Sequence, residues 1–349
     1  MASRLSMTLS LSLPPGPRTV EYARVAESLG YARLWLYDSP LLYGDVWVAL
    51  ARVAEATTRL GVGPGVLVPG LRHVATTAAA IASLESIAPG RIAVAVGTGF
   101  TARRLLGKRP HSWKAVEAYV RTLRSLLRGE IVELEGQPVQ MIHPEGFAPK
   151  RPIATPILVA ASGPRGSEIA RAIGDGVMTF SAPPSGFKWC AVVQSGTVLE
   201  AGESFASPRV FEALAPGIAL IYHSVYEAAG PGVDQLPGGA AWRAAIEGVP
   251  ERTRHLVLHE GHCVEPPARE RALLDPNVGA MTFSGTEAEL AGRIAELAAA
   301  GTTELIYSPA GPDVPRELRA MAGAARAAGM PGVGGVGQDA DGASGAGAR

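Results

Sequence analysis

The chain has little cysteine and no long hydrophobic run, and each shortage excludes a class of protein. Its 349 residues include only two cysteines, Cys190 and Cys263. Two thiols do not build a disulfide framework, so we expect a protein of the reducing cytoplasm. No apolar run is long enough to span a bilayer, and residues 1–17 lack the basic run and the cleavage site of a signal peptide. We therefore expect no association with a membrane.

The chain also lacks an excess of charge of either sign. Its 32 Lys and Arg residues balance 32 Asp and Glu residues, so the formal net charge is zero. Without a basic field the protein has no general attraction for nucleic acid, and we expect a small-molecule substrate as its partner. The G-x-S-x-G, H-E-x-x-H and Walker A patterns are also absent from the sequence.

Strand and helix patterns alternate along almost the whole chain. The hydrophobic fraction of 47% is that of a globular protein. Such alternation fits either a doubly wound sheet or a (β/α)₈ barrel, and the count and length favour the α/β TIM barrel. The predicted strands span residues 7–13, 33–38, 60–68, 91–97, 155–162, 176–183, 254–264 and 303–311.

We predict one barrel domain over residues 1–328. Between residues 183 and 250 the periodicity is hard to interpret, and we assign this region to an insertion that determines substrate specificity. Residues 329–349 are mostly glycine, alanine and small polar residues, which cannot bury a core. This end of the chain is therefore predicted to be a disordered tail.

A glycine turn follows the predicted strand 91–97. Gly97, Gly99 and Ala102 fit the dinucleotide-binding pattern G-x-G-x-x-G/A. Three βα units precede the turn, however, and the next helix is expected to begin only after Pro110. The acidic residue at the right spacing, Glu117, falls inside an amphipathic helix. We therefore interpret the turn as a place where a ligand approaches the backbone of a barrel rather than as a Rossmann fingerprint.

Four segments resemble the bacterial luciferase-like flavin and deazaflavin oxidoreductases. They cover most of the chain outside 183–250, and the resemblance is greatest to the branch of methylene-tetrahydromethanopterin reductase, which uses coenzyme F420. The segments are ESLGYARLWLYD, LGVGPGVLVP with ATTAAAIASLESIAPGRIAVAVGTG, TPILVAASGPRGSEIARAIGDGV, and GTEAELAGRIAELAAAGTTELIY. The resemblance implies a TIM barrel with an insertion, usually a homodimer, that carries out hydride transfer or flavin-mediated oxygenation.

The resemblance also implies a cofactor site at the carboxyl ends of the strands, where barrel active sites lie. Gly65 and Val66 would form a bulge behind the ring, often with a non-proline cis peptide, although a plain glycine bulge is the alternative. The phosphate would bind where SGPRGSE enters a helix, whose N-terminal amides attract anions; a simple helix cap is the alternative there. The implied cofactor residues are Asp38, Gly65, Val66, Gly97, Thr98, Gly99, Ala161, Ser162, Gly163, Pro164 and Arg165.

Two positions depart from the sugar-phosphate dehydrogenases of this family. Those enzymes have a histidine after the aspartate of the second strand and a glutamate after the glycine turn, and here Ser39 and Phe100 stand there. An acid–base pair for alcohol oxidation is therefore not expected. Asp38 remains a candidate catalytic residue, with a capping role as the alternative. The candidate substrate residues are Ser39, Tyr43, Phe100 and Phe180.

The stretch HEGHC places His259, His262 and Cys263 close together. It suggests a metal site but lacks an obvious fourth ligand, so we predict no metal. His259 is instead a candidate catalytic proton donor at the end of a barrel strand.

The leading hypothesis is an enzyme that transfers a hydride from reduced F420 to a C=C or C=N bond. The alternatives are an FMN-dependent monooxygenase and a non-catalytic barrel that binds a cofactor or a partner.

Overall fold

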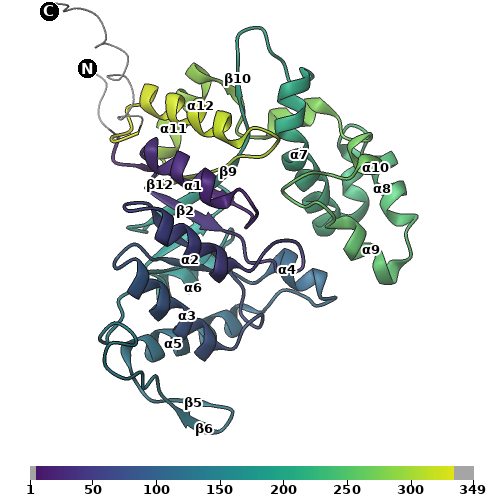
Figure 1. Cartoon of the computed structure of the whole chain (residues 1–349). Helices are drawn as coiled ribbons and strands as arrows, with labels where there is room; N and C mark the ends of the chain where they lie inside the picture. Colours follow the sequence, from purple (N-terminus) through teal and green to yellow (C-terminus); the bar gives the residue numbers. More distant parts are fainter. Residues whose placement is uncertain (1–4, 334–349) are drawn as a thin grey trace, which may run out of the picture.

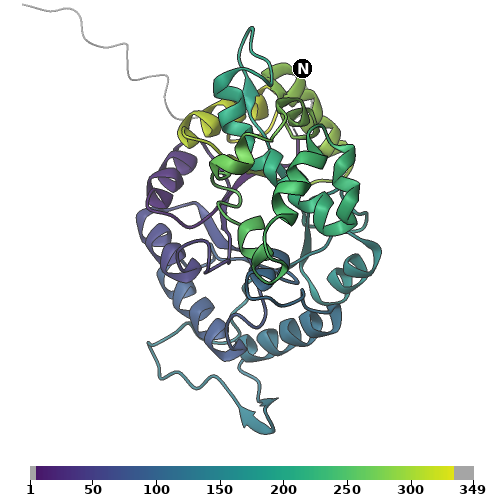
Figure 2. The same cartoon turned by 90° about the vertical axis from the view of Figure 1, so that its right-hand side faces the viewer.

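The computed structural model describes residues 5–333 and contains a closed parallel barrel. The barrel order is β1-β12-β9-β8-β7-β4-β3-β2, and Figure 2 shows the ring of helices around it. This arrangement confirms the predicted TIM barrel. The strands are β1 (Thr8–Leu13), β2 (Arg33–Leu36), β3 (Gly61–Leu67), β4 (Val94–Val96), β7 (Ile157–Ala160), β8 (Gly176–Thr179), β9 (Cys190–Ser195) and β12 (Glu304–Ser308).

Helices cover the outer face of the barrel and begin where the sequence provides caps. The Asp45 carboxylate accepts hydrogen bonds from the amides of Trp47 and Val48, as expected of an N-cap. Thr286 and Glu289 form a capping box at the start of α11. The outer helices are α1 (Thr19–Ser28), α2 (Val46–Ala56), α3 (Val74–Ile87), α5 (Trp113–Arg128), α6 (Pro164–Ile173), α11 (Glu287–Ala299) and α12 (Val314–Ala327).

Small side chains and one tryptophan fill part of the barrel interior. Ala93, Ala95 and Ala191 pack there with Trp35. The carboxylate of Glu304, which is only 3% exposed, accepts hydrogen bonds from the indoles of Trp35 at 2.9 Å and Trp189 at 2.6 Å. Glu304 is the first residue of β12, so this network lies at the end of the barrel opposite the carboxyl ends of the strands.

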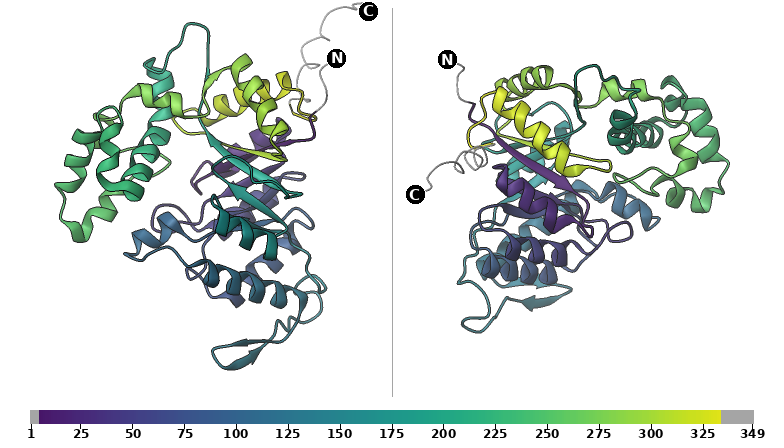
Figure 3. Two further views of the ribbon diagram at one scale, coloured as in Figure 1. Left: turned by 180° about the vertical axis from the view of Figure 1, so that it is seen from behind. Right: turned by 45° about the horizontal axis from the view of Figure 1, so that its top comes forward.

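A helical insertion stands beside the carboxyl ends of the strands (Figure 1; Figure 3). It has its own core, which includes Tyr222 and Trp242, both buried. Its elements are α7 (Pro208–Ala229), η1 (Gly230–Gln235), α8 (Gly239–Glu247), α9 (Glu251–Leu258), α10 (Ala268–Arg271) and η2 (Pro276–Met281). None of the described helices is both long and apolar enough to cross a membrane.

The predicted bounds of the insertion, 183–250, differ from those in the structure. The barrel strand β9 lies inside that range, and the helices continue to Met281. The predicted strand at 254–264 is wrong, because this segment forms the end of α9 and the turns after it. Its Leu258 is buried in the core of the insertion and Val257 packs against that core, whereas Leu256 and Val264 are exposed. The eight barrel strands therefore include CAVVQS at 190–195, which we did not predict.

Shorter elements complete the fold. The predicted hairpin around Gly136 is confirmed as β5 (Val132–Leu134) and β6 (Gln137–Val139), and β10 (Val198–Leu199) pairs with β11 (Gly285–Thr286). Of the predicted disordered tail, residues 334–349 lie outside the described residues. Its first residues are packed instead, because the apolar side chains of Met330 and Val333 join the main core.

Candidate active site

The predicted cofactor residues lie on one continuous arc of the barrel rim. They belong to β2, β3, β4 and β7 or to the loops after them; these four strands are neighbours in that order, and β8 follows β7. Contacts join each strand to the next. The Val68 amide lies 3.5 Å from the Asp38 carboxylate, and the Ser162 hydroxyl lies 3.3 Å from that of Thr179. The arc therefore forms one continuous surface.

The bulge on β3 is present at the predicted place. The Gly65–Val66 peptide is cis, which confirms that expectation, and the register with β4 shifts between Gly65 and Leu67. A Cβ at Gly65 would lie 2.9 Å from the Cβ of Trp35, and one at Gly97 would lie 2.9 Å from Val66 Cγ2. Only glycine fits at these two places without a shift of the neighbouring side chains.

The glycine turn after β4 is held by the neighbouring strand. Gly99 has a φ of +79°, and a Cβ there would lie 2.2 Å from Val68 Cγ1. The Thr98 carbonyl accepts a hydrogen bond from the His111 amide at 2.8 Å. The expectation that helix would begin only after Pro110 is wrong, because α4 (Phe100–Leu105) starts directly after Gly99.

Asp38 is buried and ion-paired rather than free. Its carboxylate lies 2.8 Å from the Arg72 guanidinium, which also binds Asp45 at 2.6 Å. Burial raises the pKa of Asp38, and the hydrogen bond from Arg72 opposes that shift only in part. Arg72 therefore connects the rim aspartate to the N-cap of α2, an ion pair that we did not predict from the sequence.

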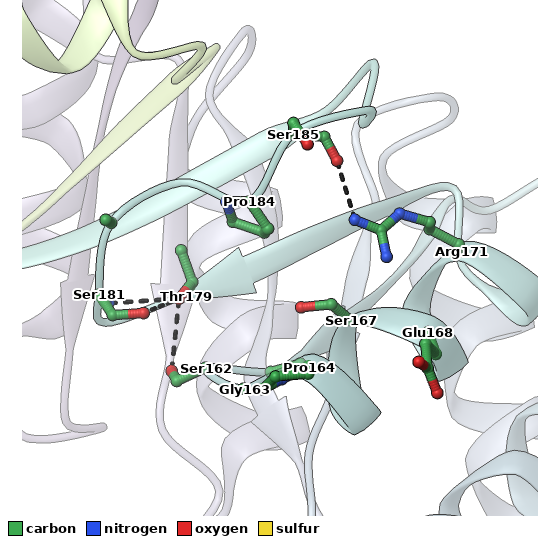
Figure 4. Close-up of a pocket in the computed structure, with 12 residues that line it drawn as sticks. Ser162, Gly163, Pro164, Ser167, Glu168, Arg171, Thr179, Ser181, Pro184 and Ser185 are labelled. Carbon is green, nitrogen blue, oxygen red and sulfur yellow. Dashed lines mark hydrogen bonds between the residues drawn. The ribbon is translucent and has the colours of Figure 1, made fainter.

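A pocket of about 390 Å³ opens at the N-terminus of α6. Figure 4 shows hydroxyl groups of Ser162, Ser167 and Ser181 around it, and α6 begins with Pro164 after Gly163. Amides at a helix N-terminus attract anions. A Cβ added at Gly163 would have no atom within 4 Å, so the backbone is open there. The pocket can therefore accept a phosphate group.

The cation beside this pocket is not the one predicted. Arg165 is exposed and does not line the pocket. Arg171, two turns further along α6, does line it, and its guanidinium donates a hydrogen bond to the Ser185 carbonyl at 3.0 Å. Glu168 also lines the pocket and partly offsets this positive charge. Helical periodicity could have identified Arg171 from the sequence, because a residue seven positions after Pro164 lies on the same side of the helix.

The predicted substrate residues lie around the same rim. Ser39 and Tyr43 are half-buried, whereas Phe100 is 44% and Phe180 65% exposed. The Tyr43 hydroxyl donates to the carbonyl of His262 at 2.5 Å. This hydrogen bond connects the loop after β2 to the insertion, so the insertion closes over one side of the rim.

His259 and His262 reach the rim from the insertion, not from a barrel strand. His259 directly follows α9 and is 1% exposed. The ring centroid of His262 lies 5.3 Å from that of His259 and 5.7 Å from that of His223, a residue of α7 that we did not single out. Burial, reinforced by these two neighbours, lowers the pKa of His262 to about 3, which keeps its ring neutral.

Two named proteins are similar to the chain in sequence. A 5,10-methylenetetrahydromethanopterin reductase of Methanolobus tindarius is 25% identical over 341 residues, which cover 90% of this chain and 98% of that protein. An F420-dependent hydroxymycolic acid dehydrogenase of Mycobacterium tuberculosis is 33% identical over 174 residues, 46% of this chain and 48% of that protein.

A solved structure has the same fold. The coenzyme F420-dependent tetrahydromethanopterin reductase of Methanopyrus kandleri superposes with a TM-score of 0.65 at 19% identity, over 91% of this chain and 97% of that one. The model of the luciferase-like monooxygenase family matches residues 3–304. The TIM-barrel fold and the residues at its rim agree with that match. The chain therefore belongs to the luciferase-like monooxygenase family.

Proposed function

We propose that this protein is an oxidoreductase that transfers a hydride between reduced coenzyme F420 and a C=C or C=N bond of a small molecule. The observation that carries the proposal is the continuous arc of rim residues, which ends in a pocket fitted to an anion. The choice of F420 is supported by relatives whose names state that coenzyme.

The residues present fit a coenzyme with a flat ring and a phosphate. The glycines at 65 and 97 let the bulge and the turn pack closely on Trp35 and Val66, which fixes the backbone proposed to lie behind the ring. Ser162 and the free amides of α6 would hold the phosphate, with Arg171 adding positive charge. Thr98, Gly99 and Ala161 would line the stretch between ring and phosphate.

When bound, the reduced coenzyme supplies the hydride, and the protein contributes binding, orientation and exclusion of water. We propose that the buried Asp38 faces the ring or the substrate, held in place by Arg72. Ser39 and Phe100 provide no acid–base pair, which favours reduction of an unsaturated bond over oxidation of an alcohol. Phe100 and Phe180 offer apolar surface to the substrate.

The second candidate is an FMN-dependent monooxygenase, and the observation that favours it is the family itself, which is named for that chemistry.

By the same family resemblance we propose that the protein is a cytoplasmic homodimer. Light scattering of the purified protein measures its mass, and a monomer at micromolar concentration would contradict the dimer.

The test is a titration of purified protein with F420 and, separately, with FMN, followed by absorbance and fluorescence quenching. Tight binding of F420 with weak binding of FMN is the expected result, and it directs the search for substrates to reducible unsaturated compounds. Selective binding of FMN would move the assignment to the monooxygenase, with oxygen consumption as the next assay. Binding of neither would overturn both and leave a non-catalytic barrel.

A further inference from the structure

Three histidines converge inside the insertion at its contact with the barrel. His223 comes from the middle of α7, and His259 and His262 come from the loop after α9. One ring nitrogen of each lies within 4.8 Å of those of the other two. The ring of His223 stacks on that of His262, and His259 meets both edge-on.

The ring nitrogens of this cluster are buried and mostly unpaired. His223 is 2% exposed and His259 is 1% exposed. Within the described residues, Nδ1 of His223, Nδ1 of His262 and both nitrogens of His259 have no hydrogen-bond partner. An unpaired buried polar group costs roughly 1–3 kcal/mol. Three such rings at one place therefore indicate a ligand that accepts their lone pairs.

A carboxylate orients the ring of His223, and a second carboxylate lies near that of His259. Nε2 of His223 donates to the Glu270 carboxylate at 2.5 Å, and that carboxylate also accepts the Trp242 indole at 2.9 Å. This hydrogen bond fixes the tautomer that leaves Nδ1 of His223 free. The Glu227 carboxylate, which pairs with Arg104 at 3.1 Å, lies 3.5 Å from Nε2 of His259 without a hydrogen bond to it. A carboxylate on the far nitrogen is the usual environment of a histidine that binds a metal.

We propose that His223, His259 and His262 together bind one divalent transition-metal ion, with zinc as the expected occupant. Neutral imidazole suits zinc, and three histidines with one open position form a known type of tetrahedral zinc site. This inference reverses our expectation from the sequence, which considered only the HEGHC stretch. The missing ligand is His223, which precedes that stretch by 36 residues and comes close only in the fold.

The geometry needs only a small adjustment to hold the ion. Zinc–nitrogen distances of about 2.0–2.1 Å place the nitrogens of a tetrahedral site about 3.4 Å apart. The nitrogens now lie within 4.8 Å of one another, so binding would draw them together by at most about 1.4 Å.

The ion would fasten the insertion where it meets the rim. The backbone of His262 accepts the hydrogen bond of Tyr43, and its Nε2 lies 3.4 Å from the Thr101 hydroxyl of α4. A metal that joins α7 to this loop would therefore hold the loop against the barrel. The site requires neither F420 nor a substrate, so its test is independent of the proposed function.

The experiment uses the full chain after treatment with EDTA and dialysis. We expect the protein to take up one Zn²⁺ per chain by elemental analysis and to gain about 5 °C in Tm at saturating zinc. With Co²⁺, the visible absorption of a tetrahedral ion should appear at the same stoichiometry. Absence of stoichiometric zinc uptake by the folded wild-type protein would overturn the proposal.

Variants locate the ion. His223→Gln and His262→Gln should each abolish the Co²⁺ absorption, while His255→Gln, in α9 and outside the cluster, should bind as the wild type does. Glu270→Gln should weaken zinc by roughly 10–100-fold, as expected for a positioning residue. Equal binding by His262→Gln and His255→Gln would refute the site. X-ray absorption of the zinc-loaded wild type needs no variant, and a first shell without imidazole would also refute it.

Discussion

The pocket at the N-terminus of α6 makes a prediction in which stability and binding change in opposite directions. The substitution is Ser162→Asp, which puts a carboxylate beside the amides proposed to hold the phosphate of F420. A negative charge at a helix N-terminus stabilises the helix by about 0.3–1 kcal/mol. The Ser162 hydroxyl makes only long hydrogen bonds, of 3.3 and 3.4 Å, so their loss costs little. The variant should therefore fold at least as stably as the wild type.

The same carboxylate should repel the phosphate. Two like charges about 5 Å apart interact by about 0.8 kcal/mol in bulk water and about 3 kcal/mol at a protein surface. Ser162 is exposed, so we take about 1.5 kcal/mol and add about 1 kcal/mol for the lost hydroxyl. The sum of about 2.5 kcal/mol corresponds to roughly 70-fold weaker binding.

Fluorescence quenching of F420 measures the Kd, and thermal unfolding measures the stability. The matched control is Ser207→Asp, which places the same charge at the N-terminus of α7, outside the pocket. It should leave the Kd unchanged. If Ser162→Asp is folded and binds F420 as tightly as the wild type, the phosphate does not bind at α6.

Three other perturbations test separate parts of the structure. Arg171→Ala should weaken the binding of F420 about 5-fold at low salt and less at high salt, because this exposed charge is screened by salt. Arg165→Ala should bind F420 as the wild type does, and equal losses of affinity in the two variants would refute the placement of the phosphate. Glu304→Leu leaves the buried indole N–H of Trp35 and the half-buried one of Trp189 without an acceptor and should cost about 3 kcal/mol of unfolding free energy in urea, with the F420 Kd unchanged. Desolvation raises the pKa of the half-buried Cys263 to about 12, so the thiol stays protonated at pH 8 and should react with a disulfide reagent far more slowly than in the unfolded chain; equal rates would contradict this.

Local patterns in the sequence were sufficient for the barrel and for most of the rim. Parallel strands buried on both faces have continuous apolar runs, and these runs end at residues such as Asp38 and Gly97. Since every strand of a barrel ends at the same face, the loops after the strands had to converge. The bulge at Gly65 and the helix entry at Gly163 could be located by the same reasoning together with the family resemblance.

Local patterns failed where a segment depends on a partner distant in sequence. The apolar stretch 254–264 has no feature that separates a short helix from a strand, and only the core of the insertion decides that it is helical. The strand β9 was missed although its six residues equal β1 in length, because CAVVQS lies where the helix and strand patterns no longer alternate clearly, and pairing with β8 and β12 places it in the barrel.

The sequence by itself determined the fold class, the family and the loops that form the rim, because hydrophobic period and glycine placement act over a few residues. Only the tertiary structure decided which charged groups face the pocket and which histidines meet. Both side chains are exposed, but Arg171 rather than Arg165 lines the pocket because the two lie on different sides of the helix. His223 joins His262 because α7 packs against the loop after α9, and no spacing along the chain encodes that contact.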